Sequence, residues 1–210
     1  GTVRAEDLLG AYVEHVLSFI DVAAMRPLKV VADTANGMGG LVVPPVFERL
    51  PMTLVHLYPE LDGTFPNHPA DPIDPANRRD LDREVRERRA DIGLAFDGDA
   101  DRVFLVDERA EGVSGSEVTA LIAAAMLERH PGASVVYNLI CSWTVPEVIL
   151  EHGGRPIRTR VGHSFIKQVM AETGAVFGGG CVFACLASDP QALTTSARPA
   201  SRHVHRGTEA

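Results

Sequence analysis

Two kinds of apolar pattern alternate along the chain, and this alternation restricts the fold more than any other feature of the sequence. Short apolar runs bounded by turn residues predict buried strands, and apolar residues three or four positions apart predict helices. Such alternation favours sheets covered by crossover helices, an α/β fold. The expected strands are 29–32, 53–58, 134–138, 155–159 and 175–177, with a hairpin over 92–106. The expected helices are 9–20, one with Pro44 and Pro45 in its first turn, 80–89, 116–129, 145–151 and 164–172.

A second α/β unit is expected from near Gly112 onward, although its similarity to the first is too faint to indicate a repeat. Ser116 is expected to cap the helix over 116–129. The apolar face of that helix is expected to comprise Val118, Leu121, Ile122, Ala125 and Met126. The segment 181–210 has no helical or alternating period and is rich in Ala, Ser, Arg and Pro, so we expect an irregular or disordered tail.

Three aspartates, Asp97, Asp99 and Asp101, stand at alternate positions between the two strands of the expected hairpin. Two unit charges about 4 Å apart interact by roughly 4 kcal/mol at a near-surface dielectric. A fold keeps such a cluster if a cation lies in it. Ligation by carboxylates alone favours a hard divalent ion, Mg²⁺ or Ca²⁺, over zinc, which prefers nitrogen and sulfur. The acidic turn is therefore interpreted as a metal site.

Three other interpretations of the acidic turn stay open from the sequence. It could be a solvated turn without an ion. In an EF-hand loop the three aspartates would be the first ligands and Glu108 the twelfth, but Arg102 replaces the required sixth glycine and helices should flank the loop. In an aspartyl phosphatase Asp97 would be the nucleophile and Asp99 the general acid, but Lys167 is the only lysine after them.

Four segments, in matching order and spacing between about Leu28 and Gly179, resemble the α-D-phosphohexomutases, the phosphomannomutase/phosphoglucomutase family. Residues 93–103, Gly-Leu-Ala-Phe-Asp-Gly-Asp-Ala-Asp-Arg-Val, resemble the metal loop of that family. Residues 30–40 resemble the opening strand and turn of its second domain, and Gly-Thr-Phe-Pro-Asn-His at 63–68 resembles its Pro-Asn-His segment. Residues 160–167, Arg-Val-Gly-His-Ser-Phe-Ile-Lys, resemble the sugar-contacting turn and helix of its third domain.

The resemblance implies two consecutive α/β domains with mixed sheets covered by helices, the second incomplete. Residues 1–110 would be domain II, with the metal-binding loop, and residues 111–180 the sugar-binding domain III. It implies Mg²⁺ as the cofactor and a hexose phosphate (mannose or glucose 1- or 6-phosphate) as the ligand. The implied site residues are the metal ligands Asp97, Asp99 and Asp101, Arg102 beside the reacting phosphate, and Gly162, His163 and Lys167 at the substrate.

In that family a phosphoserine donates its phosphoryl group to the sugar phosphate and is phosphorylated again by the reoriented bisphosphate. The Ser-His-Asn-Pro type of segment that carries this serine does not occur in the 210 residues. After Gly179 the family's Glu and Ser-x-His are replaced by Gly180-Cys-Val-Phe-Ala-Cys, which favours a shifted reading frame. We therefore expect an isomerase by family, an intramolecular phosphotransferase, that is inactive as this chain alone. The alternative is a non-catalytic Mg²⁺-binding or sugar-phosphate-binding module.

Composition narrows the range of partners. The net charge of −8 argues against a nucleic-acid surface. No apolar run approaches the roughly 20 residues of a membrane span, so we expect no membrane partner. The three cysteines, Cys141, Cys181 and Cys185, have no metal or redox spacing, and their odd number fits a reducing cytosol, so we expect a cytoplasmic protein. The sequence gives no signal for an oligomeric state.

Overall fold

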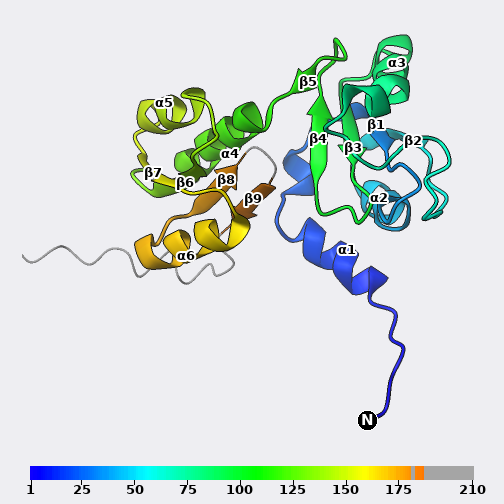
Figure 1. Ribbon diagram of the computed structural model, residues 1–210, viewed down its shortest axis with the longest axis horizontal. Helices are drawn as coiled ribbons and strands as arrows, with labels where there is room; N and C mark the ends of the chain where they lie inside the picture. The colour runs from blue at the N-terminus through cyan, green and yellow to red at the C-terminus, as the bar shows by residue number, and fades with distance from the viewer. Residues whose placement is uncertain (181–182, 187–210) are drawn as a thin grey trace, which may run out of the picture. The chain divides into compact units, whose positions relative to one another are not determined.

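The computed structural model describes residues 1–180 and the backbone of 183–186, and it divides the chain into two compact units, Gly1–Ser114 and Gly115–Ala210. Each unit has one sheet of mixed strand direction with helices packed on it, which confirms the expected fold class (Figure 1). The division lies beyond the expected boundary at residue 110 because 112–113 pair with the first sheet.

The sheet of the first unit has the order β2-β1-β3-β4-β5. The central strand β1 (Leu28–Asp33) pairs in parallel with β2 (Met52–Leu57) and with β3 (Ile92–Phe96). The edge is antiparallel, since β4 (Val103–Val106) pairs with β3 and β5 (Gly112–Val113) pairs with β4. The carboxyl ends of β1 and β3 therefore meet at one edge of the sheet, where ligand sites of α/β folds lie.

Helices cover both faces of this sheet (Figure 1). The connections from β1 to β2 and from β2 to β3 cross the sheet in opposite directions, so right-handed crossovers place α2 (Gly39–Phe47) and α3 (Arg79–Arg88) on opposite faces. Leu81 and Val85 of α3 are fully buried against the sheet. The remaining elements of this unit are α1 (Leu9–Leu17), which packs on α2, and the 3₁₀ turns Val22–Ala24 and Pro75–Arg78.

Pro44 and Pro45 lie in the second half of α2, and the expectation that they occupy its first turn is wrong. The helix begins earlier, at Gly39, because the tight turn before it leads directly into helical backbone, with the Gly40 N–H donating to the Gly37 carbonyl at 3.0 Å. The prolines remove two helical N–H donors. The helix nevertheless continues past them, since the Glu48 N–H donates to the Pro44 carbonyl at 3.0 Å.

The second unit has the sheet order β7-β6-β8-β9. The central strand β6 (Ser134–Asn138) pairs in parallel with β7 (Arg155–Thr159) and β8 (Phe177–Gly180), and β9 (Phe183–Leu186) pairs antiparallel with β8. This order repeats β2-β1-β3-β4 of the first unit. The two units therefore share a topology that their sequences do not reveal.

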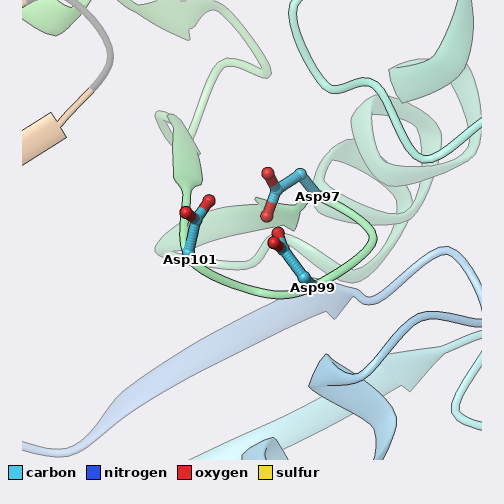
Figure 2. A group of neighbouring side chains, drawn as sticks. All are labelled: Asp97, Asp99 and Asp101. Carbon is cyan, nitrogen blue, oxygen red and sulfur yellow. The ribbon is translucent and has the colours of Figure 1, made fainter. Parts of the chain in front are cut away.

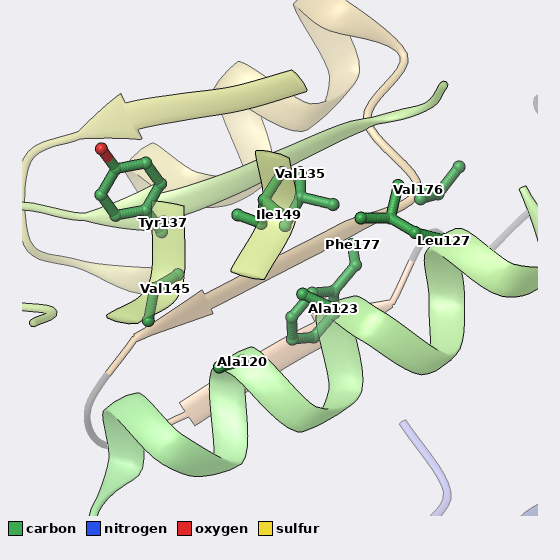
Figure 3. Close-up of a cluster of buried hydrophobic side chains, with 9 residues drawn as sticks. All are labelled: Ala120, Ala123, Leu127, Val135, Tyr137, Val145, Ile149, Val176 and Phe177. Atoms are coloured by element: carbon green, nitrogen blue, oxygen red, sulfur yellow. The ribbon is translucent and has the colours of Figure 1, made fainter. Parts of the chain in front are cut away.

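Side chains of β6 alternate between two helical layers, as the two-residue period of a strand requires. Val135 and Tyr137 pack with α4 and α5, together with Ile149 and Phe177 (Figure 3), whereas Val136 packs with α6 on the opposite face. The helices of this unit are α4 (Gly115–Arg129), α5 (Thr144–Glu151) and α6 (His163–Thr173).

The expected details of α4 are wrong in two respects. Ser116 lies inside the first turn, because the helix begins at Gly115, and its hydroxyl oxygen accepts a hydrogen bond from the Ser142 N–H at 3.0 Å. The buried face is rotated from the expected one: Leu121 is 65% exposed, the buried apolar residues are Ala120, Ala123 and Leu127, and of the expected face Ile122 and Met126 pack, partly buried, against the core. Apolar residues surround most of α4, so their spacing alone does not determine which face is buried.

Part of the segment expected to be irregular forms β9, since residues 183–186 pair with the open backbone edge of β8. The expectation for 181–182 and 187–210 lies outside the described residues. Within the described part of the chain, every helix is too short or too polar to cross a lipid bilayer.

Candidate functional site

The acidic turn connects β3 and β4 at the carboxyl edge of the first sheet, and both flanking segments are strands, as expected for the hairpin. Figure 2 shows the side chains of Asp97, Asp99 and Asp101 converging on one small region. A ligand oxygen from each carboxylate lies within 4.8 Å of the others. The expected metal ligands are thus brought together by the local fold of a single loop.

Arg102 supplies a positive charge to this cluster. Its Nε donates to Asp97 Oδ2 at 2.6 Å and lies 3.3 Å from Asp101 Oδ1, and its backbone N–H donates to Asp97 Oδ1 at 3.1 Å. The hydrogen bond to Asp97 raises the pKa of the Arg102 guanidinium above its ordinary value. Asp97 is only 2% exposed, whereas the other two aspartates are exposed. The buried carboxylate is therefore neutralised by the guanidinium, and the exposed pair faces solvent.

The backbone of the turn is left-handed at Ala100, with φ of +59°. For a residue with a Cβ this conformation costs about 1–2 kcal/mol. The Ala100 N–H donates to the Asp97 carbonyl at 3.1 Å, which closes the turn and brings the aspartates together. Strain of this kind is typical of functional loops that the surrounding structure holds in place.

Two segments distant in sequence support the acidic turn at Gly98. The Met38 N–H, from the turn after β1, donates to the Gly98 carbonyl at 2.9 Å, and a Cβ at Gly37 would lie 2.6 Å from the same oxygen. Phe65, from the long loop after β2, approaches so closely that a Cβ at Gly98 would lie 3.3 Å from its ring. The sequence did not predict these contacts. The only feature in the sequence that pointed to them was that the segments 30–40 and 63–68 both resemble segments of the same family as the acidic loop.

The donor set fits a hard divalent cation, because it consists of carboxylate oxygens and lies at the strand edge. The EF-hand alternative is wrong, since strands rather than helices flank the loop, and Glu108 is not among the clustered ligands of the described residues.

The expected substrate residues lie at the start of α6 in the second unit. Gly162 is the N-cap residue, and its φ of +131° is a conformation that only glycine adopts readily. His163 and Lys167 are exposed and four residues apart on the helix, hence on one face. The Arg160 guanidinium lies 3.6 Å from the centre of the Phe165 ring, which fixes the turn before the helix.

Fold and site together define a protein of two α/β units, with an acidic loop at the carboxyl edge of the first sheet and a glycine-capped helix in the second. The family models agree: residues 10–112 match "Phosphoglucomutase/phosphomannomutase, alpha/beta/alpha domain II", and residues 114–180 match domain III of the same family. The chain belongs to the α-D-phosphohexomutase family and contains its second and third domains.

Individual relatives agree with this assignment. The chain is 37% identical over 185 residues to a phosphomannomutase of Escherichia coli, which covers 85% of the chain and 41% of the relative. A phosphoglucomutase/phosphomannomutase family protein of Burkholderia thailandensis has a similar crystal structure, with a TM-score of 0.81 and 35% identity, covering 86% of this chain and 39% of that one.

A more distant solved structure shares the fold. It is N-acetylphosphoglucosamine mutase of Aspergillus fumigatus in complex with GlcNAc-6P and magnesium, with a TM-score of 0.62 and 16% identity, covering 92% of this chain and 42% of that one. The chain therefore spans about 40% of the length of the proteins that it matches.

Proposed function

We propose that the chain supplies the Mg²⁺ site and part of the sugar-phosphate site of a phosphomannomutase/phosphoglucomutase, an isomerase that moves a phosphoryl group between positions of a hexose phosphate. The observation that carries this proposal is the convergence of three carboxylates within 4.8 Å on a loop whose nearest cation is Arg102. The relatives are more than twice as long, so the reaction is proposed for these domains together with the others that the relatives contain. The 210-residue chain alone is expected to bind ligands without turnover.

In this proposal Arg102 has one role before the metal ion binds and another role afterwards. Without an ion, its guanidinium neutralises Asp97. Bound Mg²⁺ would neutralise charge on the phosphoryl oxygens. Because Asp97 would then be a metal ligand, the Arg102 guanidinium would be released, and a phosphate oxygen could accept its hydrogen bonds.

The second unit is proposed to hold the sugar phosphate. The N-terminus of α6 carries the positive end of the helix dipole, which favours an anion. Lys167 adds a full positive charge one turn further along the same face, beside His163. Gly162 lets the backbone enter this helix at a φ of +131°, so an added Cβ would disturb the proposed anion position.

Isothermal titration with MgCl₂ tests the metal site. Asp99→Asn removes one exposed ligand charge without a change of shape, and we expect it to weaken Mg²⁺ binding by about tenfold or more, since each carboxylate ligand supplies a full charge. Glu108→Gln is the matched control, because it removes an exposed carboxylate after the same hairpin but outside the ligand cluster.

The result expected is a loss of heat in Asp99→Asn with wild-type behaviour in Glu108→Gln. Equal heats in wild type and Asp99→Asn would contradict the metal site. Equal losses in both variants would point to non-specific attraction by the acidic surface.

A further inference from the structure

A buried ion pair between Asp33 and His68 connects the two segments that contact the acidic loop at Gly98. Asp33, the last residue of β1, is 2% exposed, and its Oδ1 accepts a hydrogen bond from the Ala35 N–H at 2.9 Å. Its Oδ2 lies 3.0 Å from Nε2 of His68, whose side chain is 14% exposed. A carboxylate so deeply buried requires a partner charge, because an unpaired one costs several kcal/mol.

The hydrogen bonds of His68 define its protonation state. Nδ1 lies 2.9 Å from the Pro69 carbonyl oxygen, which only accepts, so Nδ1 carries a proton. Nε2 faces the Asp33 carboxylate, which also accepts only. This geometry favours an imidazolium, in which both ring nitrogens donate, paired with a buried carboxylate.

Other titratable groups face this pair from neighbouring elements. The Tyr58 ring, just after β2, packs edge-on against His68 at 5.4 Å, and the Tyr58 hydroxyl donates to Asp80 of α3 at 2.6 Å. The hydrogen bond to Asp33 raises the pKa of His68, and the charge of Asp80 acts in the same direction, while burial opposes both. The charge on Asp33 also acts on His56 of β2, but burial outweighs it and lowers the pKa of His56.

The ion pair is connected to the acidic loop along two routes. Through Ala35, Asp33 holds the turn whose Met38 N–H donates to the Gly98 carbonyl. Through His68, it holds the long loop that places Phe65 against Gly98. The two routes are tied together by Asn67, whose side chain donates to Asn36 Oδ1 at 2.8 Å.

We propose that Asp33 and His68 are positioning residues for the metal loop, and that deprotonation of His68 loosens this loop and weakens Mg²⁺ binding. This inference rests on the proposed metal site. Since the pKa of His68 is raised in the folded protein, the support is complete below the ordinary histidine pKa of about 6.5 and is lost as the pH rises through the raised value. The long-range charge effect alone predicts the opposite pH dependence, because the loss of the positive charge of His68 at higher pH would strengthen Mg²⁺ binding.

The test compares Mg²⁺ affinity by calorimetry at about pH 6 and about pH 9, on either side of the histidine range. Wild type is expected to bind about five- to tenfold more weakly at the higher pH, a coupling of ordinary size. Asp33→Asn should bind equally at both, because an asparagine amide can donate to neutral His68 while its oxygen still accepts from Ala35. His152→Gln, which removes an exposed histidine of the second unit, should keep the wild-type pH dependence.

A metal-free measurement separates this inference from the proposed function. The protection of the Met38 amide against hydrogen exchange reports its hydrogen bond to the Gly98 carbonyl. In wild type this protection should be lower at the higher pH, after correction for the intrinsic change in exchange rate. In Asp33→Asn the protection should be the same at both pH values. If wild-type affinity and Met38 protection are both independent of pH, the positioning role is overturned and the metal site stands. If no Mg²⁺ heat appears at either pH, the metal site fails, and Met38 protection decides the positioning role.

Discussion

Substitution of Gly37 by alanine should displace the acidic loop without altering any of its three proposed metal ligands. The new Cβ would lie 2.6 Å from the Gly98 carbonyl oxygen, whereas ordinary contact begins at 3.4 Å, so turn and loop must separate by about 0.8 Å. Overpacking of this kind costs about 1–3 kcal/mol, and stretching of the bond from Met38 to Gly98 adds about 1 kcal/mol. The two costs sum to about 2–4 kcal/mol, and the lower end alone, about 2 kcal/mol, should lower the melting temperature of a domain of about 100 residues by about 8–16 °C.

Thermal melting and Mg²⁺ calorimetry on the same samples check this reasoning, and two control variants separate its parts. Gly63→Ala lies in the same unit with nothing within 4 Å of its new Cβ, so it should behave as wild type. Val85→Ala should cost about 2 kcal/mol by opening a cavity in the core beneath α3 but should keep Mg²⁺ affinity well below its melting temperature. Gly37→Ala should lose both stability and affinity. A Gly37→Ala protein that melts and binds like Gly63→Ala would refute the argument.

Three further outcomes are expected. Arg102→Gln should tighten Mg²⁺ binding to the isolated chain in calorimetry, because the guanidinium no longer competes for Asp97. Weaker binding would contradict the proposal that Mg²⁺ displaces the guanidinium from Asp97. Ile149→Ala, a fully buried side chain in the second unit, should cost about 2–5 kcal/mol in a denaturant melt of that unit while leaving Mg²⁺ affinity unchanged. Burial, together with the hydrogen bond to Asp80, raises the pKa of Tyr58 to about 12, so a stabilising contribution present below its ordinary pKa of 10.0 is lost as the pH rises toward 12. Alkaline melts of Tyr58→Phe should lack this loss.

Local patterns in the sequence predicted local structure well. The strands 134–138 and 155–159 lie within the expected bounds, and the hairpin over 92–106 forms around the aspartates. A hairpin loop needs no distant partner to bring alternate residues together, which explains why the acidic cluster could be predicted from one segment. His163 and Lys167 were assigned to the substrate only by resemblance, and they lie one turn apart because α6 begins at 163, one residue earlier than expected.

What the sequence did not predict depends on pairing between distant segments. The partnership of Asp33 with His68 requires β1 and the loop after β2 to meet, and no local pattern encodes their distance. The buried face of α4 depends on which apolar side chains meet β8, and Leu121 was assigned to the wrong side. The common strand order of the two units was hidden because many different apolar residues fill equivalent positions.

The position of Arg102 has a consequence for how the first unit assembles. A hairpin closes within about 1–10 μs, and the residue that neutralises Asp97 lies inside the same hairpin. The like charges of the turn therefore meet a counter-charge as soon as β3 and β4 pair, long before the slower joining of Val30 to Ile92 brings β1 beside them. A nascent chain can thus form this turn in a compartment poor in free divalent ions. Loading of the proposed metal site would then be a property of the finished domain rather than a condition of its synthesis.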